Sequence, residues 1–69
     1  MPEYKIDGAQ SVVAVLVSGG IVKSGNEARR LIKQGAVFFD NENITGEDFL
    51  IDRQGVLKAG SRRYLKIIL

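Results

Sequence analysis

The clearest hydrophobic pattern in the chain lies between residues 24 and 35, where apolar and polar side chains alternate with the period of a helix. Ser24 and Glu27 have the spacing of a capping box, in which each side chain accepts a hydrogen bond from the other residue's backbone N–H. Gly35 suits the left-handed residue that commonly ends a helix. We therefore expect a helix of about ten residues. Its core side would carry Ala28, Leu31 and Ile32.

The opposite side of this helix is basic. Arg29, Arg30 and Lys33 share one arc with Asn26, because residues three or four positions apart are neighbours on a helix. Three cations on one arc repel each other, so an external anion is a natural partner. A simpler interpretation also stands: most charged helical faces are only solvated, and Glu27 offsets part of the repulsion through Arg30.

A second apolar segment precedes this helix at residues 12–17 and is apolar around most of a helical circumference. Its valines make a buried strand a real competitor, because β-branching costs side-chain freedom in a helix. We favour a buried helix, because capping residues precede the segment and a glycine pair at 19–20 ends it. The capping signals are a D-x-x-Q box at residues 7–10 and, in competition with it, Ser11.

Beyond residue 35 the pattern changes to the period of strands. Two helices followed by short strands predict an α+β fold, in which two short helices pack on a small antiparallel sheet. Residues 11–69 would form this single domain, after a lead-in or linker at residues 1–10. Because the last predicted strand runs to Leu69, we expect this residue to be a natural C-terminus. The apolar runs lie at 36–39, 49–51 and 56–57, and turn formers occupy 40–43, 45–48 and 52–55.

The last strand-like segment, residues 62–69, alternates between two kinds of side chain. Its odd-numbered positions are mostly apolar and should face the core, although this set includes Arg63. Its even-numbered positions place Arg62, Tyr64 and Lys66 on an exposed face. Such a row suits a sugar-phosphate backbone with a base or ribose to stack on. A charged edge strand that guards against aggregation is the alternative.

Composition narrows the functional classes. The chain has 69 residues, 45% of them hydrophobic and 26% charged, which fits one small globular domain. It has no cysteine and no histidine, so disulfides, thiolate metal sites and Ser-His or Cys-His catalytic pairs are excluded. No apolar run approaches the roughly 20 residues of a membrane span. We expect neither a metal nor a cofactor.

The charges are segregated, although the net charge is only +2. Residues 40–52 hold five acidic side chains and no lysine or arginine, whereas the other residues hold ten cations and three acidic side chains. Such a separation gives one part of the molecule a field that attracts anions. A calcium loop in the acidic segment is disfavoured, because Ile44 interrupts the alternate oxygen ligands in Asp40-x-Glu42-x-Ile44.

Residues 23–37 carry the pattern K-S-x-x-E-A-R-R-L-I-x-Q-G-x-V, which resembles the alpha-L RNA-binding motif of the ribosomal small-subunit protein four type. The segment V-L-K-x-G-x-R-R-Y-L-K-I at residues 56–67 is most similar to the version that closes bacterial-type tyrosyl-tRNA synthetases. That family usually has Asn-Gly after the first strand. Here Glu42 follows Asn41, so we expect a looser turn or a different register.

The resemblance implies an RNA-binding domain that grips the variable arm and anticodon side of tyrosine tRNA. The catalytic domain of such a ligase would lie outside this chain, and we expect no catalytic residues within it. The parent synthetase would be a homodimer in the bacterial cytoplasm or an organelle, with this domain monomeric and no membrane or metal partner. A ribosomal-RNA-binding module of the same fold, stand-alone or appended, and a protein-interaction domain are the alternatives.

The resemblance also implies which side chains bind RNA. Lys23 and Ser24 would present donors at the N-terminus of the basic helix. Tyr64 would stack on a base or ribose. The other candidates would meet phosphates from the helix and from the end of the chain: Arg29, Arg30, Lys33, Lys58, Arg62, Arg63 and Lys66.

Overall fold

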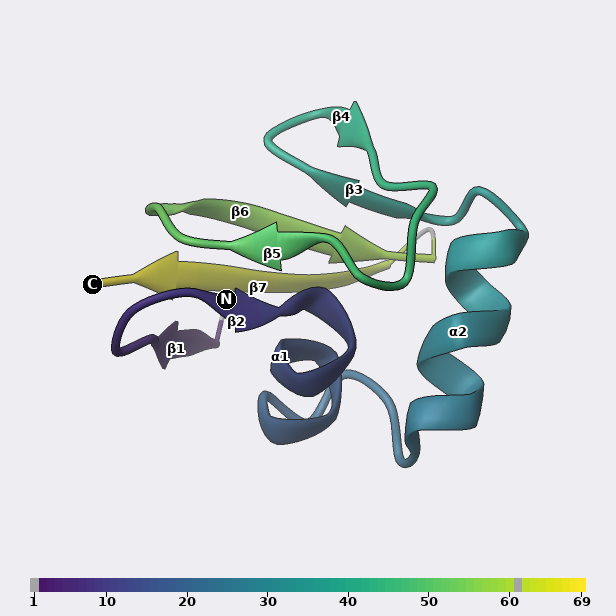
Figure 1. Cartoon of the computed structure of the whole chain (residues 1–69), viewed down its shortest axis with the longest axis horizontal. Helices are drawn as coiled ribbons and strands as arrows, with labels where there is room; N and C mark the ends of the chain where they lie inside the picture. Colours follow the sequence, from purple (N-terminus) through teal and green to yellow (C-terminus); the bar gives the residue numbers. More distant parts are fainter. Residues whose placement is uncertain (1, 61) are drawn as a thin grey trace.

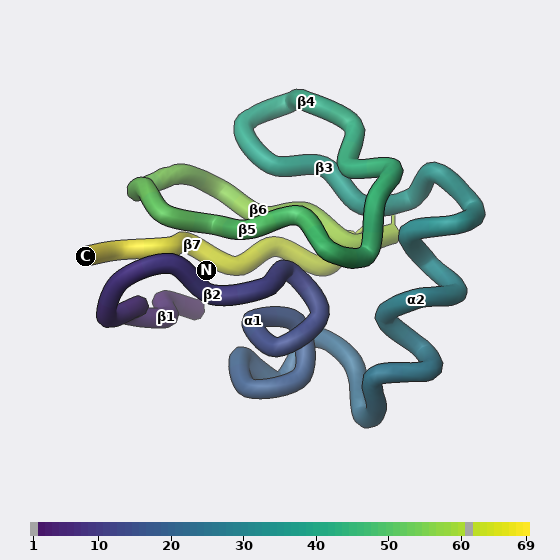
Figure 2. Tube along the Cα trace, in the orientation of Figure 1, coloured from purple at the N-terminus to yellow at the C-terminus, as the bar shows by residue number. Residues whose placement is uncertain are grey.

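In the computed structural model, which describes residues 2–60 and 62–69, the chain forms two helices and seven short strands (Figure 1). The two helices and the loop between them lie together beside the sheet (Figure 1), and the C-terminal end of β7 lies on the side away from α2 (Figure 2). In chain order the elements are β1 (Glu3–Lys5), β2 (Gln10–Ser11), α1 (Val12–Ser18), α2 (Gly25–Lys33), β3 (Val37–Phe39), β4 (Glu42–Asn43), β5 (Leu50–Ile51), β6 (Gly55–Ala59) and β7 (Arg63–Ile68).

Five strands form the main sheet in the order β1-β7-β6-β3-β4, and β2 pairs with β5 in a small second sheet. Every neighbouring pair in the main sheet is antiparallel except β1 with β7, which is parallel. The predicted α+β class, with two short helices on a small sheet, is therefore confirmed, and the sheet is mixed only at its β1 edge.

The valine-rich segment forms the buried helix α1. Val12, Val15 and Leu16 are fully buried, so the competing strand interpretation is wrong. The helix starts at Ser11, whose Oγ accepts a hydrogen bond from the Ala14 backbone N–H at 3.1 Å. The alternative cap at residues 7–10 is also wrong, because Gln10 and Ser11 extend as β2 along β5 before the helix begins.

The amphipathic segment forms α2 as expected. Ser24 Oγ accepts from the Glu27 backbone N–H at 3.3 Å, and Gly35 takes the left-handed φ of 72° directly after the helix end. Ala28 and Ile32 are buried in the core. Local capping and periodicity together were enough to place this helix.

Residues 3–6 join the main sheet. Tyr4 pairs with Ile67 across the parallel β1–β7 ladder, and the Ile6 N–H donates to the Ile68 carbonyl at 2.8 Å. Ile6 is itself part of the hydrophobic core. The segment that looks like a lead-in by sequence thus supplies strand β1 and the core residue Ile6. A three-residue strand is too short for a period of two to be visible.

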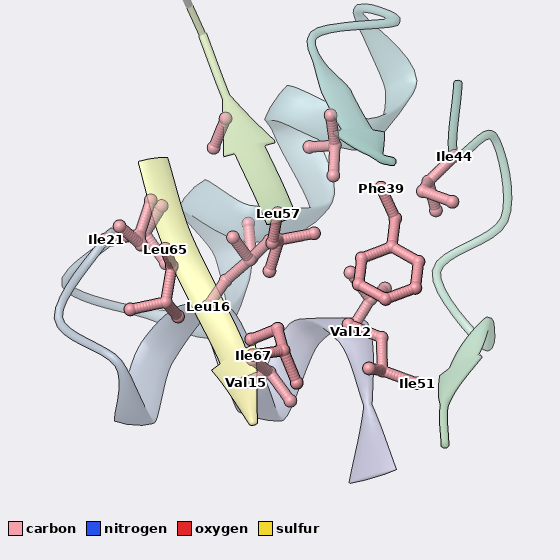
Figure 3. Packing of buried hydrophobic residues seen from close by; sticks show 14 of the residues in the cluster. Val12, Val15, Leu16, Ile21, Phe39, Ile44, Ile51, Leu57, Leu65 and Ile67 are labelled. Carbon is pink, nitrogen blue, oxygen red and sulfur yellow. The ribbon is translucent and has the colours of Figure 1, made fainter. Parts of the chain in front are cut away.

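The core lies between the helices and the inner face of the sheet (Figure 3). Strand alternation directs Leu57 of β6 and Leu65 and Ile67 of β7 toward the helices, where Val15 and Leu16 of α1 meet them. Burying a side chain of this size contributes about 1.5–3 kcal/mol, so these contacts dominate the stability of a small domain.

The β3–β4 connection is a two-residue turn. Phe39 pairs with Glu42, and the intervening Asp40 and Asn41 have φ angles of 52° and 67°. Positive φ at both central residues is the property of a type I′ hairpin turn. Of the two expected alternatives, the looser turn is therefore wrong and the different register is confirmed, because Asp40-Asn41 takes the place of Asn-Gly one residue earlier. The Asp40 carboxylate also accepts a hydrogen bond from the Val56 backbone N–H at 3.0 Å.

We expect Asn41→Val to lower the free energy of unfolding by about 1–2 kcal/mol, because a β-branched residue is strained at positive φ. Asn41→Gly is the matched control and should be neutral or stabilising, since glycine adopts this φ freely. Urea unfolding followed by circular dichroism measures both. Equal stability of the two variants would mean that the turn is not the tight one described.

Candidate nucleic-acid interface

The exposed arc of α2 carries Arg29, Arg30 and Lys33, as the periodicity predicts. Arg29 is held in place, because its Nη1 donates to Asn26 Oδ1 at 3.2 Å and its Nε lies 3.8 Å from Glu47 Oε2. Glu47 belongs to the acidic segment, which therefore reaches the basic helix at this point. Arg29 marks the border between the two charged regions.

A hollow of about 570 Å³ opens where the N-terminus of α2 approaches the start of β7. Its lining includes Lys23, Arg62, Arg63 and Tyr64, together with the carboxylate-bearing Glu27. A second hollow of about 370 Å³ continues along α2 and is lined by Arg30 as well as by Arg63. The two hollows bring together cations from α2, from the loop before it and from the start of β7 with the turn before that strand. This surface is here called the basic band: Lys23, Arg30, Arg62 and Arg63.

Arg63 lies where the two hollows meet. Its guanidinium Nη1 donates to the Ile21 carbonyl oxygen at 2.6 Å and lies 3.6 Å from Glu27 Oε1. The strand alternation directs Arg63 toward the helices, as expected, yet 58% of its side chain stays exposed. It therefore links β7 to the loop between the helices and still presents charge at the surface.

Ser24 has a structural contact as well. Its Oγ accepts the Glu27 N–H that begins α2, which leaves the hydroxyl hydrogen as the one donor it could offer an external oxygen. The positive end of the α2 dipole adds to the basic band at this position.

The remaining predicted side chains lie on the outer face of the sheet, away from the helices. Strand pairing sets Phe38 of β3, Lys58 of β6 and Tyr64 of β7 side by side, and this set is here called the aromatic row. Lys58 Nζ lies 5.9 Å from the Phe38 ring centroid and 5.7 Å from that of Tyr64. Lys66 lies one pleat further along β7, with its Nζ 3.9 Å from Glu3 Oε2.

Sequence reasoning missed Phe38. The residue lies in an apolar run of four, and periodicity alone does not tell which of its members face outward. Only the register of β3 against β6, set by contacts about twenty positions apart in the chain, places it beside Lys58. Tyr64 is the residue that belongs to both surfaces, since it also lines the hollow next to Arg62.

The chemistry of these surfaces is that of fixed positive charges, hydrogen-bond donors and flat rings. Such groups bind phosphates and stack on bases. In residues 2–60 and 62–69, no group of three or more acidic side chains converges as a metal site would require. Neither helix in this part of the chain is long and apolar enough to cross a bilayer.

Comparison with known proteins agrees with this chemistry. The family described as the tyrosine–tRNA ligase SYY-like C-terminal domain matches residues 1–66. The chain belongs to this family. It is 39% identical over 70 residues to the tyrosine–tRNA ligase of Dehalococcoides mccartyi strain CBDB1 and 44% identical over 77 residues to that of Carboxydothermus hydrogenoformans. Each alignment covers 99% of this chain.

The chain spans only a fifth or less of these relatives, 18% and 19% of their respective lengths. The tyrosine–tRNA ligase of Thermotoga maritima, at 36% identity, is covered over 17% of its length. Family membership confirms the resemblance to the domain that closes tyrosyl-tRNA synthetases. The ten candidate side chains stay predictions, since the relatives identify the domain and not its contact residues.

We expect Arg63→Ala to lower the free energy of unfolding by about 1 kcal/mol, because a charge-assisted hydrogen bond and a half-exposed ion pair are lost. Arg62→Ala is the matched control from the neighbouring position, and it should change stability by less than about 0.5 kcal/mol. Urea unfolding measures both. A loss for Arg62→Ala as large as that for Arg63→Ala would contradict the structural contact assigned to Arg63.

Proposed function

We propose that this domain binds tRNA and holds the variable arm and anticodon side of tyrosine tRNA for a tyrosyl-tRNA synthetase. The catalytic residues of that enzyme would lie outside the chain, which has no histidine or cysteine. Membership in the tyrosine–tRNA ligase C-terminal domain family supports the proposal. The parent enzyme would act as a homodimer in the bacterial cytoplasm or an organelle, with this domain monomeric within it.

The observation that carries the proposal is the basic band. Three of its cations line one hollow, and Arg63 continues the positive surface into a second hollow beside Arg30. Phosphate groups spaced along an RNA backbone could occupy both hollows at once. Arginine suits this task, because its planar guanidinium makes paired hydrogen bonds to phosphate oxygens.

Contacts of this kind position an RNA without reading its sequence. Discrimination would come from the shape of the tRNA, because the grooves of an RNA duplex offer protein side chains little sequence information. A rigid surface built from a helix and a strand, and anchored by the Arg63 contact to Ile21, is suited to recognising shape. The acidic segment at residues 40–52 would repel RNA from the adjoining side and so set its orientation.

Binding of tyrosine tRNA to the 69-residue chain should weaken steeply with salt, with a log-log slope of about −0.7 to −0.9 for each phosphate contacted. Arg30→Ala and Lys33→Ala should each weaken binding and reduce that slope by about one. Fluorescence anisotropy over a salt series measures both quantities. The matched control is Arg53→Ala, which removes an exposed arginine paired with Asp52 beside the acidic segment and should leave binding unchanged.

Three outcomes separate the candidate functions. Preference for tyrosine tRNA over the same tRNA without its variable arm supports the synthetase assignment. Equal binding to every structured RNA would overturn the tRNA specificity and favour a general RNA-binding module. Absence of binding at low salt would overturn the RNA proposal and leave a protein-interaction domain as the alternative.

A further inference from the structure

The outer face of the sheet is a second surface with its own chemistry. The aromatic row crosses three neighbouring strands, and the ammonium group of its central Lys58 lies within 6 Å of both flanking ring centroids. Tyr64 is 40% exposed and Phe38 is half-buried, so both rings reach solvent. These side chains point away from the helices and contribute nothing to the core cluster.

We propose that this face binds unpaired nucleotides, with bases stacked on Phe38 and Tyr64 and a phosphate at Lys58. This inference rests on the proposed RNA-binding function and adds a second contact to it. Base–aromatic stacking is tolerant of sequence because every base has a flat face. A lysine between two rings places a positive charge where the backbone joining two stacked bases would pass.

The spacing of the rings decides in favour of unpaired RNA. Phe38 and Tyr64 stand on strands separated by β6, which puts their backbones about 10 Å apart, or two inter-strand spacings. Neighbouring bases in a duplex are roughly 3.4 Å apart and are enclosed by their own stack. The row can therefore hold bases only from a strand that is splayed open, as in a loop, a bulge or an end.

The position of Tyr64 connects this face to the basic band. Tyr64 is also among the residues that line the hollow containing Lys23 and Arg62, so a strand leaving the aromatic row would next meet these cations. RNA with a helical stem next to an unpaired segment fits this arrangement, with the stem against α2 and the unpaired bases on the sheet.

Charge argues against an apolar protein surface as the occupant. Lys58 lies within the row and Lys66 one pleat further along β7, so a covering apolar partner would have to desolvate both. Burying an ammonium group without a counter-charge is costly. Glu3 lies 3.9 Å from Lys66, and within residues 2–60 and 62–69 no ion pair includes Lys58, so we assign to Lys58 an anionic group brought by the ligand.

The test compares two RNAs and a set of ring variants in the 69-residue chain. The probes are a fluorescein-labelled stem with a single-stranded tail and the same stem with its tail paired. Phe38→Leu and Tyr64→Leu remove a flat ring but keep an apolar side chain. Tyr64→Phe keeps the ring, and Phe49→Leu removes a ring packed against the core elsewhere.

We expect Phe38→Leu and Tyr64→Leu each to weaken binding of the tailed RNA about tenfold and of the fully paired RNA less than twofold. Tyr64→Phe and Phe49→Leu should bind both RNAs as the parent chain does. Equal loss on both RNAs, or no loss on either from variants with native amide spectra, would overturn the inference.

A measurement on the unmodified chain keeps the test independent of variant folding. Stacking of a base shifts the ring protons of Phe38 and Tyr64 upfield when the tailed RNA is added, and the paired RNA should not do so. Absence of that shift at saturation would overturn the inference. If the ring protons do not shift but Arg30→Ala still weakens binding of both RNAs, the inference fails and the proposed RNA-binding function stands. If neither RNA binds at all, the inference and the proposed function both fail.

Discussion

Burial of the inward-facing side chains of β7 is the interaction on which the rest of this structure depends. Leu65 and Ile67 are almost completely buried against the helices. The fit is close, because a Cβ added to Gly19 at the end of α1 would clash with Leu65 Cδ2. A chain of 69 residues without cysteine has no cross-link to supplement so small a core. Buried residues of both helices belong to the same core cluster as Leu65 and Ile67, and the basic band takes its shape from the helices and this strand.

The same strand supplies the surface chemistry. Because side chains alternate along a strand, the pleat that buries Leu65 exposes Tyr64 and Lys66 on the other face. At the start of β7, Arg63 donates to the Ile21 carbonyl and so fixes the strand to the loop that leads into α2. Core packing and the geometry of the candidate interface are thus consequences of one register. A substitution in the β7 core would disturb both.

The sequence predicted what local rules determine. The helix α2 could be placed from Ser24, Glu27 and Gly35, because caps act within a few residues. The sequence did not predict the features that depend on pairing between distant segments. The parallel strand β1, the two-residue turn at Asp40-Asn41 and the position of Phe38 all follow from register. The cations of the basic band were predicted singly, but their arrangement around two hollows required the fold.

Mapping of backbone amide shifts in the 69-residue chain, as tyrosine tRNA is added, tests the central claim most directly. The account predicts perturbed amides along α2, at residues 20–24 and at the start of β7, with residues 40–46 and 52–54 unaffected. That pattern would place the RNA on the basic band, where α2 approaches the start of β7. Perturbations centred on residues 40–54, or no perturbation at low salt, would contradict it.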